Sequence, residues 1–260
     1  MNIKLRRKRI IDLLSAHGTI EVKNLAQELN TSLVTVRSDL SNLEKEGKLQ
    51  RFLGGAQLPA SNGDTQNQFR NQEIEVNMRH QMNDIAKERI AKQAASLVEE
   101  YSSIIIDSGS TTHKLSLELA KKGNLTVITN NLTAASSLIN ISTVTLVICG
   151  GVYRTVSQSI HGQKAEQFFD GIYADIAFIG ADGLDPSKGI TTFNEGYNIT
   201  QKMVECAKSI VVLADSSKLS RAGFNQVLPT EKLQTLIIDS GISDEVIEEF
   251  EAKGIEVIVV

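Results

Sequence analysis

The stretch SLVTVRSDLSNLEKEGKLQRFLGGA, residues 32–56, joins a helix-like segment to a basic and apolar ribbon that contains two adjacent glycines. One face of the helical part carries apolar residues at helical spacing: Leu33, Val36, Leu40 and Leu43. Thr31 or Ser32 is the expected N-cap of this helix, and Gly47 its expected end. The ribbon KLQRFLGGAQL then predicts two short strands that form a hairpin around Gly54-Gly55.

Two more helices are expected before this stretch. Residues 4–16 place Ile10, Leu13 and Leu14 on one face, and residues 22–29 repeat apolar side chains at helical spacing. Thr19-Ile20 is expected to be a short connection between them. Two short helices that meet at a three-residue turn, the second with an exposed polar half, match the geometry that places a recognition helix in the DNA major groove.

A DNA-binding role is also favoured by the charge distribution. Residues 1–58 hold ten Lys and Arg against six Asp and Glu, a net charge of +4, whereas the whole chain carries −4, so the remaining residues carry −8. Thr35, Arg37 and Ser38 would then reach base edges or phosphates, while Arg51 and the glycine tip would follow the neighbouring backbone. The candidate DNA-binding residues are Ser32, Val34, Thr35, Arg37, Ser38, Arg51, Gly54 and Gly55. The alternative is a small helical dimerisation domain with a basic face.

The rest of the chain predicts a second, larger unit. Residues 59–72 are polar and are expected to be a linker, and a helical pattern returns between Glu73 and Glu100. Short apolar runs then alternate with helical ones, which indicates a mainly parallel sheet covered by helices on both faces. The predicted strands are residues 103–107, 125–129, 143–149, 175–180, 209–215, 235–239 and 255–260.

An anion site is expected where the first of these strands meets its helix, in IIIDSGSTTHKLSLEL, residues 104–119. Backbone N–H groups at a helix N-terminus, beside small hydroxyl side chains, suit a phosphate, although Ser and Thr also favour such turns as simple helix caps. Other strand ends carry Gly, Asn, Asp or Lys, and ligands of parallel sheets bind at that edge. The candidate effector-binding residues are Asp107, Ser108, Gly109, Ser110, Thr111, Thr112, Asn130, Gly150, Gly151, Asp182 and Lys218.

Residues 4–57 resemble the winged helix-turn-helix of DeoR-type transcriptional regulators. The family string is roughly V..LA..L..S..TVRRDL..LE..G...R.HGGA, and the chain has VKNLAQELNTSLVTVRSDLSNLEKEGKLQRFLGGA. The resemblance implies a DNA-binding regulator, with double-stranded operator DNA as its partner. Two departures concern DNA contacts, because Ser38 stands where the family usually has a second arginine and Leu53 where it often has histidine. The operator sequence therefore cannot be copied from relatives.

From about residue 78 onward, the chain resembles the sensor domain of the same family, which is similar to ribose-5-phosphate isomerase. SGSTT looks like the phosphate loop of those proteins, GADGLD like their Gly-Ala-Asp motif and VVLADSSKL like their late strand. The resemblance implies that Lys218 holds a phosphate or hydroxyl and that Asp182 binds sugar hydroxyls. An isomerase needs a carboxylate base, but the matching place falls near Ile199, Thr200 and Gln201, none of which is acidic, although Glu195 lies nearby and Glu205 follows. We therefore expect a binding pocket with no catalytic residue.

The expected architecture is α/β, with a winged helix-turn-helix domain at 1–58, a linker and the start of a connecting helix at 59–77, and a sensor domain at 78–260. The expected function is a repressor of a carbohydrate operon, controlled by a phosphorylated sugar or hexitol; 189–203 looks most like members of the galactitol and sorbitol type. A homo-oligomer, either dimer or tetramer, is expected because one winged helix gives modest specificity. The alternatives are a sugar-phosphate isomerase with a fused helical domain and a protein-interaction scaffold.

No cofactor, metal ion or membrane association is expected. The two cysteines, Cys149 and Cys206, lie in apolar segments without a Cys or His at ligand spacing, so we expect buried thiols in a reducing compartment. His113 and His161 have no second ligand nearby in the sequence. The basic start of the chain is not followed by a continuous apolar run, and no segment approaches the roughly 20 apolar residues of a membrane span. These features predict a cytoplasmic protein.

Overall fold

The computed structural model divides the chain into two compact units, Met1–Asn67 and Gln68–Val260, which are considered separately. It describes residues 3–17, 19–45, 48–52, 55–57, 73–193, 199–219 and 221–260. The expected helix end at Gly47, the hairpin tip at Gly54 and the linker at 59–72 lie outside these residues. The expected domain limits remain predictions.

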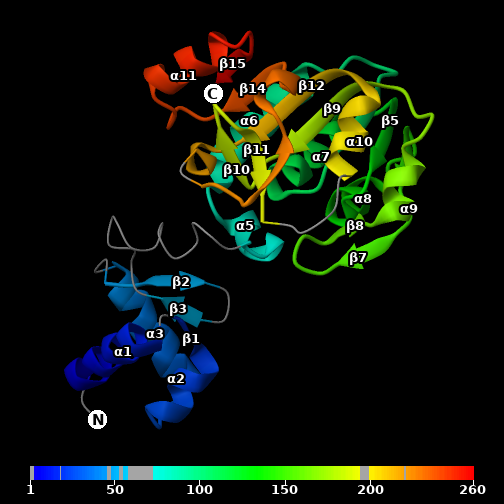
Figure 1. The fold of residues 1–260 in the computed structure, drawn as a ribbon. Helices are drawn as coiled ribbons and strands as arrows, with labels where there is room; N and C mark the ends of the chain where they lie inside the picture. Colours follow the sequence, from blue (N-terminus) through cyan, green and yellow to red (C-terminus); the bar gives the residue numbers. More distant parts are fainter. Residues whose placement is uncertain are drawn as a thin grey trace. The chain divides into compact units, whose positions relative to one another are not determined.

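The first unit packs three helices against a small antiparallel sheet with strand order β1-β3-β2 (Figure 1). Its elements are α1 (Ile3–His17), β1 (Thr19–Glu21), α2 (Val22–Glu28), α3 (Leu33–Lys45), β2 (Gln50–Phe52) and β3 (Gly55–Gln57). The predicted apolar positions form its core, including Ile10 and Leu14 of α1, Leu25 of α2 and Leu40 of α3, all fully buried. The three helices and the hairpin are therefore confirmed.

Three local features of this unit refine or correct the sequence prediction. Ser32 is the N-cap of α3, because its hydroxyl oxygen accepts a hydrogen bond from the Thr35 N–H at 3.1 Å. The connection predicted at Thr19-Ile20 is instead strand β1, whose pairing with β3 makes the wing three-stranded. Leu33, predicted to lie on the buried face, is 44% exposed, because it stands in the first turn of α3, outside the core.

The second unit contains a seven-stranded sheet of order β15-β14-β12-β9-β4-β5-β6, in which every neighbouring pair is parallel. All seven strands correspond to predicted ones: β4 (Ser103–Ile106), β5 (Leu125–Thr129), β6 (Val144–Ile148), β9 (Ala174–Gly180), β12 (Ala207–Ala214), β14 (Thr235–Ile238) and β15 (Glu256–Val259). The parallel sheet inferred from continuous apolar runs is confirmed.

Helices cover both faces of this sheet, as predicted (Figure 1). Ile104 and Ile106 point into one apolar cluster and Ile105 into the other, since side chains alternate along a strand. One cluster includes residues of α6 (Asp84–Ser96), α7 (Ser110–Lys122) and α8 (Leu132–Leu138); the other includes residues of α9 (Gln163–Phe168), α10 (Ile199–Glu205) and α11 (Asp244–Glu251). Both faces are therefore buried core.

The helix expected over residues 73–100 is interrupted. Its first part is α5 (Val76–Gln81), and α6 begins only at Asp84. Between them Asn83 adopts a left-handed conformation with φ of 53°, which ends one helix and redirects the chain into the next. The apolar residues keep their helical spacing through this break, so the sequence pattern does not indicate that the helix is interrupted.

Short strands and turns border the edge of the sheet where the parallel strands end. They are β7 (Val152–Arg154), β8 (Ser159–His161), β10 (Gly183–Asp185), β11 (Gly189–Thr192) and β13 (Asn225–Leu228), with the short 3-10 helices η1 (Ser216–Lys218) and η2 (Thr230–Lys232). None of these short strands was predicted. They build walls around the edge at which ligands of parallel sheets bind. None of the helices in the described ranges is long and apolar enough to cross a membrane.

Candidate functional site

The outer face of α3 carries the polar side chains predicted to contact DNA. Val34, Arg37 and Ser38 are exposed, whereas Thr35 is half-buried and its hydroxyl lies 2.8 Å from that of Ser32. Gly55 pairs with both Phe52 and Glu21 in the wing. The side chain of Arg51 and all of Gly54 lie outside the described part of the structure.

Two of the basic residues of this unit form ion pairs within it. Asp39 of α3 is buried and accepts hydrogen bonds from the Nε atoms of Arg6 at 2.5 Å and Arg7 at 3.0 Å. These ion pairs fix α1 against α3. Arg6 and Arg7 therefore hold α3 in place, which leaves Arg37 as an exposed basic side chain on the candidate DNA-facing surface.

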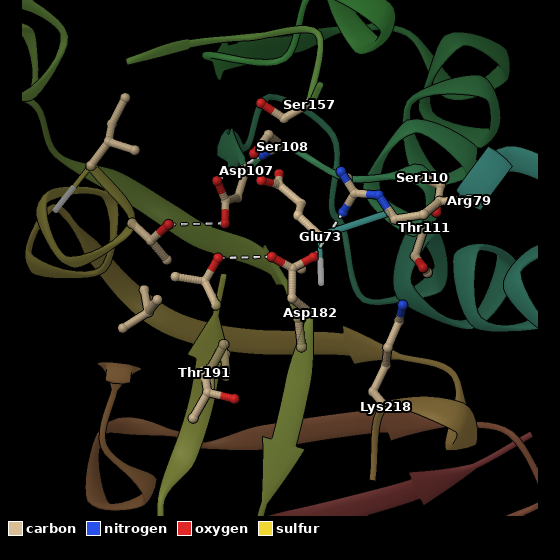
Figure 2. A pocket seen from close by; sticks show the side chains of 18 of the residues that line it. Glu73, Arg79, Asp107, Ser108, Ser110, Thr111, Ser157, Asp182, Thr191 and Lys218 are labelled. Atoms are coloured by element: carbon tan, nitrogen blue, oxygen red, sulfur yellow. Dashed lines mark hydrogen bonds and ion pairs between the residues drawn. The ribbon is translucent and has the colours of Figure 1, made fainter. Parts of the chain in front are cut away.

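The second unit has a pocket at the carboxyl ends of its central strands, and Figure 2 shows it from close by. Seven of the eleven predicted effector-binding residues line it: Asp107, Ser108, Gly109, Ser110, Thr111, Asp182 and Lys218. These residues come from the end of β4, the start of α7, the end of β9 and η1. Segments separated by more than a hundred residues in the sequence thus form one site.

The loop between β4 and α7 presents backbone donors to this pocket. The N-cap of α7 is Gly109, which has no side chain to satisfy the first N–H groups of the helix. Asn131 braces the loop from behind, since its side-chain nitrogen lies 3.3 Å from the Gly109 carbonyl oxygen and 3.4 Å from that of Asp107. Gly180 also packs closely against this loop, because a Cβ at that position would lie 3.0 Å from the Ser108 carbonyl oxygen.

Two carboxyl groups of the pocket, the buried Asp107 and the half-buried Asp182, have pKa values shifted in opposite directions. Burial raises the pKa of Asp107 to about 7, although its carboxylate accepts hydrogen bonds from the Ser108 N–H and the Thr200 hydroxyl. Burial also disfavours ionisation of Asp182, but the charges of Arg79 and Lys218 hold its pKa below the usual value. Asp182 is therefore ionised at neutral pH, whereas Asp107 exchanges its proton near neutral pH.

Lys218 places a buried ammonium group in the same pocket. Its side chain is 7% exposed and has no hydrogen bond or ion pair with another described residue. In Figure 2 its nitrogen points into the pocket, on the side where Thr111 lies. Burial lowers the pKa of Lys218, while the charges of Asp215 and Asp182 act in the opposite direction. These two carboxylates balance part of the buried charge, but neither contacts the ammonium directly, so an anionic ligand would supply a direct partner.

Four predicted effector-binding residues do not line this pocket. Thr112 is fully buried and its hydroxyl donates to the Gly109 carbonyl at 3.0 Å, so it stabilises the loop from within. Asn130 donates its side-chain N–H to the Ile160 carbonyl at 3.1 Å. Gly150 is exposed, and a Cβ at Gly151 would collide with the carbonyl of His161 at 2.6 Å. Asn130 and Gly151 thus hold the β7–β8 hairpin in place.

Several lining residues were not predicted from the sequence. They are Glu73, Arg79, Arg154, Ser157, His161, Gly180, Ala181, Ile190, Thr191, Thr192, Ile199, Thr200 and Val227. Glu73 and Arg79 precede the sheet in the sequence, and Arg154 and Ser157 belong to the hairpin region that was not recognised. The sequence offered one signal, the basic residue Arg79 within the predicted connecting helix. Such a residue requires a polar or charged partner when it is buried.

Two ion pairs cross the pocket wall. Arg79 donates from Nη1 to Asp182 at 2.9 Å, and Arg154 makes a two-pronged contact with the Glu73 carboxylate, 2.6 Å at Nη1. His161 lies 2.7 Å from the Ser159 hydroxyl, and burial lowers its pKa to about 4, so it is neutral at physiological pH. His113 does not line the pocket; its Nε2 lies 3.1 Å from the Ser137 hydroxyl.

The place expected for an isomerase base is occupied by uncharged residues. Ile199 and Thr200 line the pocket, and the Thr200 hydroxyl is committed to Asp107. Of the two acidic residues near this place, Glu205, at the far end of α10, is exposed and pairs with Lys202, and Glu195 lies outside the described residues. Among the described residues, no group of three or more His, Cys, Asp or Glu could hold a metal ion. The arrangement suits binding of a polar anion rather than proton transfer at this position.

The two units together define a transcriptional regulator with a winged helix-turn-helix and an α/β sensor. Residues 6–62 match the DeoR-like helix-turn-helix domain, and residues 82–240 match the DeoR C-terminal sensor domain. The chain therefore belongs to the DeoR family of DNA-binding transcriptional regulators, as its sequence indicated.

Relatives of similar length carry regulator names. The chain is 34% identical to the lactose phosphotransferase system repressor of Lactococcus lactis, over 96% of each chain. It is 32% identical to the HTH-type transcriptional regulator GolR of Listeria innocua, over 97% of this chain and 96% of that one. A ribose 5-phosphate isomerase of Methanocaldococcus jannaschii aligns with 52% of this chain and 54% of its own, at 23% identity and a TM-score of 0.39, too low to support an argument about function.

Proposed function

We propose that this regulator is a repressor of a carbohydrate-utilisation operon, whose sensor unit binds a phosphorylated sugar or sugar alcohol and thereby changes operator affinity. One observation carries the proposal: the N-terminus of α7 and the buried ammonium of Lys218 belong to one pocket, and no acidic side chain among the described residues forms a hydrogen bond or ion pair with either of them. Both favour an anion, and a phosphate can accept hydrogen bonds from several donors at once.

The rest of the pocket suits a polyhydroxylated ligand. Asp182 is ionised and can accept hydrogen bonds from hydroxyl groups, and Thr191 and Thr192 line the same wall. The predominance of charged and hydroxyl side chains disfavours an apolar ligand. A hexitol phosphate or ketohexose phosphate is the first candidate, on the basis of the resemblance of residues 189–203 to regulators of galactitol and sorbitol utilisation.

The DNA side of the proposal assigns α3 to the major groove. Arg37, Ser38 and Thr35 would contact bases or phosphates, Val34 and Ser32 would lie at the interface, and the wing with Arg51, Gly54 and Gly55 would follow the backbone. A homo-oligomer, dimer or tetramer, would present two such helices to repeated half-sites. The site of action would be the cytoplasm, where the operator is.

The effector half of the proposal is tested by isothermal titration calorimetry of the full chain with a panel of hexose and hexitol phosphates and their unphosphorylated parents. We expect one phosphorylated compound to bind, its parent to bind far more weakly, and Lys218→Met to weaken binding at least tenfold. Lys232→Met is the matched control, because Lys232 is exposed on η2, away from the pocket. Equal affinity of Lys218→Met and Lys232→Met would contradict the assignment of the phosphate site.

A further inference from the structure

We propose that Arg79, on the first helix after the linker, is a further ligand of the effector's anionic group, and that the effector thereby immobilises the segment leading to the DNA-binding unit. We call residues 73–83 the arm. The inference rests on the proposed function, because it concerns the same pocket. It adds a binding residue outside the strand-end motifs and assigns it a role in regulation.

The first argument is the incomplete hydrogen bonding of Arg79. Its side chain is 9% exposed and lines the pocket, and Nη1 donates to Asp182. Its Nε is buried and has no partner in the structure. Buried N–H donors are nearly always satisfied, so an unsatisfied one on a side chain that lines a polar pocket indicates a missing ligand. Guanidinium groups bind phosphate through two donors, and Arg79 has a donor that Asp182 does not use.

The second argument is the position of Arg79 relative to the other anion-binding groups. Helix α5 packs against α7, and Arg79 lines the same pocket as Ser110 and Thr111 of α7. Figure 2 draws Arg79 and Lys218 on the side of the pocket where Ser110 and Thr111 lie. Arg79 and Lys218 carry two positive charges beside the carboxylates of Asp182 and Asp215. A phosphate would accept hydrogen bonds from the donors of both cations that these carboxylates leave unused.

The arm is also joined to η1, the short helix that carries Lys218. Lys87 is 1% exposed and donates from Nζ to the carbonyl oxygens of Arg79 and of Met82, the latter at 2.6 Å, so it fixes the end of α5. Asn83 donates its side-chain N–H to Asp215 Oδ1 at 2.7 Å, and Asp215 caps η1, which carries Lys218. An anion held by both Arg79 and Lys218 would close a ring of contacts between the arm and η1.

Such a ring would make the mobility of the arm, and hence of the linker before it, depend on whether the pocket holds an anion. The arm begins directly after the predicted linker, so a change in its mobility alters how the two DNA-binding domains of an oligomer can be arranged. A ligand shifts such an equilibrium only through contacts that differ between the states. Contact between the effector anion and Arg79 is of this kind, because it forms only when α5 lies against the pocket.

The test uses inorganic phosphate as the probe, with the full chain at constant ionic strength set by chloride. Amide hydrogen exchange is followed in residues 76–82 and 108–112, and binding is measured by calorimetry. We expect phosphate to slow exchange in both segments of the wild type. Arg79→Lys keeps a positive charge for Asp182 but loses the fork of donors, so it should bind phosphate about tenfold more weakly and lose the slowing at 76–82.

Arg89→Lys is the matched control, because Arg89 is exposed on α6 and does not line the pocket; it should behave as the wild type. Unchanged phosphate affinity of Arg79→Lys, with Lys218→Met weakened, would overturn this inference and leave the proposed function standing. Absence of phosphate binding to the wild type, together with no binding of any sugar phosphate, would overturn both. If Arg79→Lys were unstable, slowing at 108–112 without slowing at 76–82 in the wild type would still overturn the role of the arm.

Discussion

The hydroxyl of Thr200 donates a hydrogen bond to the buried carboxylate of Asp107 over 3.2 Å. This contact joins the start of α10 to the carboxyl end of β4. The resemblance to sugar-phosphate isomerases would place a carboxylate base at the start of α10, where Thr200 stands. A threonine hydroxyl at neutral pH does not remove a proton from a sugar carbon. The contact therefore closes one wall of the pocket and supports a binding role.

Asp107 should make the stability of the chain depend on pH. Its pKa of about 7 in the folded state lies above its ordinary value of 3.8, so between these values the folded chain retains a proton that the unfolded chain has lost. The stability contributed by this group falls as pH rises through that window. Between pH 5 and pH 8 the loss should be about 2 to 3 kcal/mol. Asp107→Asn should remove this pH-dependent loss. Urea unfolding at pH 5 and pH 8 measures the free energy of unfolding of the variant and of the wild type.

The comparison with Asp107→Asn isolates this group from other titrations. Burial lowers the pKa values of His80 and His161 from 6.5 to about 4. These two groups therefore add stability as pH rises between 4 and 6.5, and they do so equally in the wild type and in Asp107→Asn. A pH dependence of unfolding identical in wild type and Asp107→Asn would show that the carboxyl group is ionised throughout.

Ser32→Ala should destabilise the DNA-binding unit. The Ser32 hydroxyl caps α3 through the Thr35 N–H, and loss of such a cap costs about 1 kcal/mol. Thermal unfolding followed by circular dichroism measures the change. Ser38→Ala is the control, because Ser38 is exposed within the same helix and makes no capping contact. Equal melting temperatures for the two variants would refute the capping role.

Arg37→Ala should weaken DNA binding and change its salt dependence. If Arg37 contacts a phosphate, its loss reduces the slope of log affinity against log salt concentration by about one. Anisotropy titrations at several salt concentrations provide the slope. Arg9→Ala is the control, since Arg9 is exposed on α1, away from the proposed recognition surface. A larger loss of affinity in Arg9→Ala than in Arg37→Ala would move the interface to α1.

Glu73→Gln should loosen the start of the arm. The variant removes the ion pair with Arg154, a partly exposed pair whose loss costs about 1 kcal/mol. Faster exchange is expected at the Val76 N–H, which donates to the Val156 carbonyl at 2.8 Å. Glu75→Gln, which alters an exposed residue of the same arm, should leave this exchange unchanged. No difference between the two variants would mean that the ion pair does not hold the arm.

The sheet was predictable because local patterns determine it. Each of the seven parallel strands is a continuous apolar run, which burial on both faces requires, and side chains such as Ile104 and Ile105 need no partner beyond the helices that cover them. The loop from Asp107 to Thr111 was predictable for a similar reason, because a strand, a Gly-Ser turn and a helix follow one another directly.

The rest of the pocket depends on contacts distant in sequence. Arg79 meets Asp182 across 103 residues, and Arg154 meets Glu73 across 81 residues, so no local pattern indicates either pair. The break at Asn83 was missed because apolar periodicity continues on both sides of it. Asn130 and Asn131 illustrate the same limit: both follow one strand, and Asn131, rather than the predicted Asn130, braces the loop between β4 and α7.

The most direct test of the account is fluorescence anisotropy of the purified full chain on DNA from upstream of its own gene, with and without the phosphorylated compound selected by calorimetry. We expect tight, salt-sensitive binding that this compound changes at least tenfold in the wild type and not in Lys218→Met, which should still bind the DNA. Operator binding that no phosphorylated sugar or hexitol alters would contradict the account.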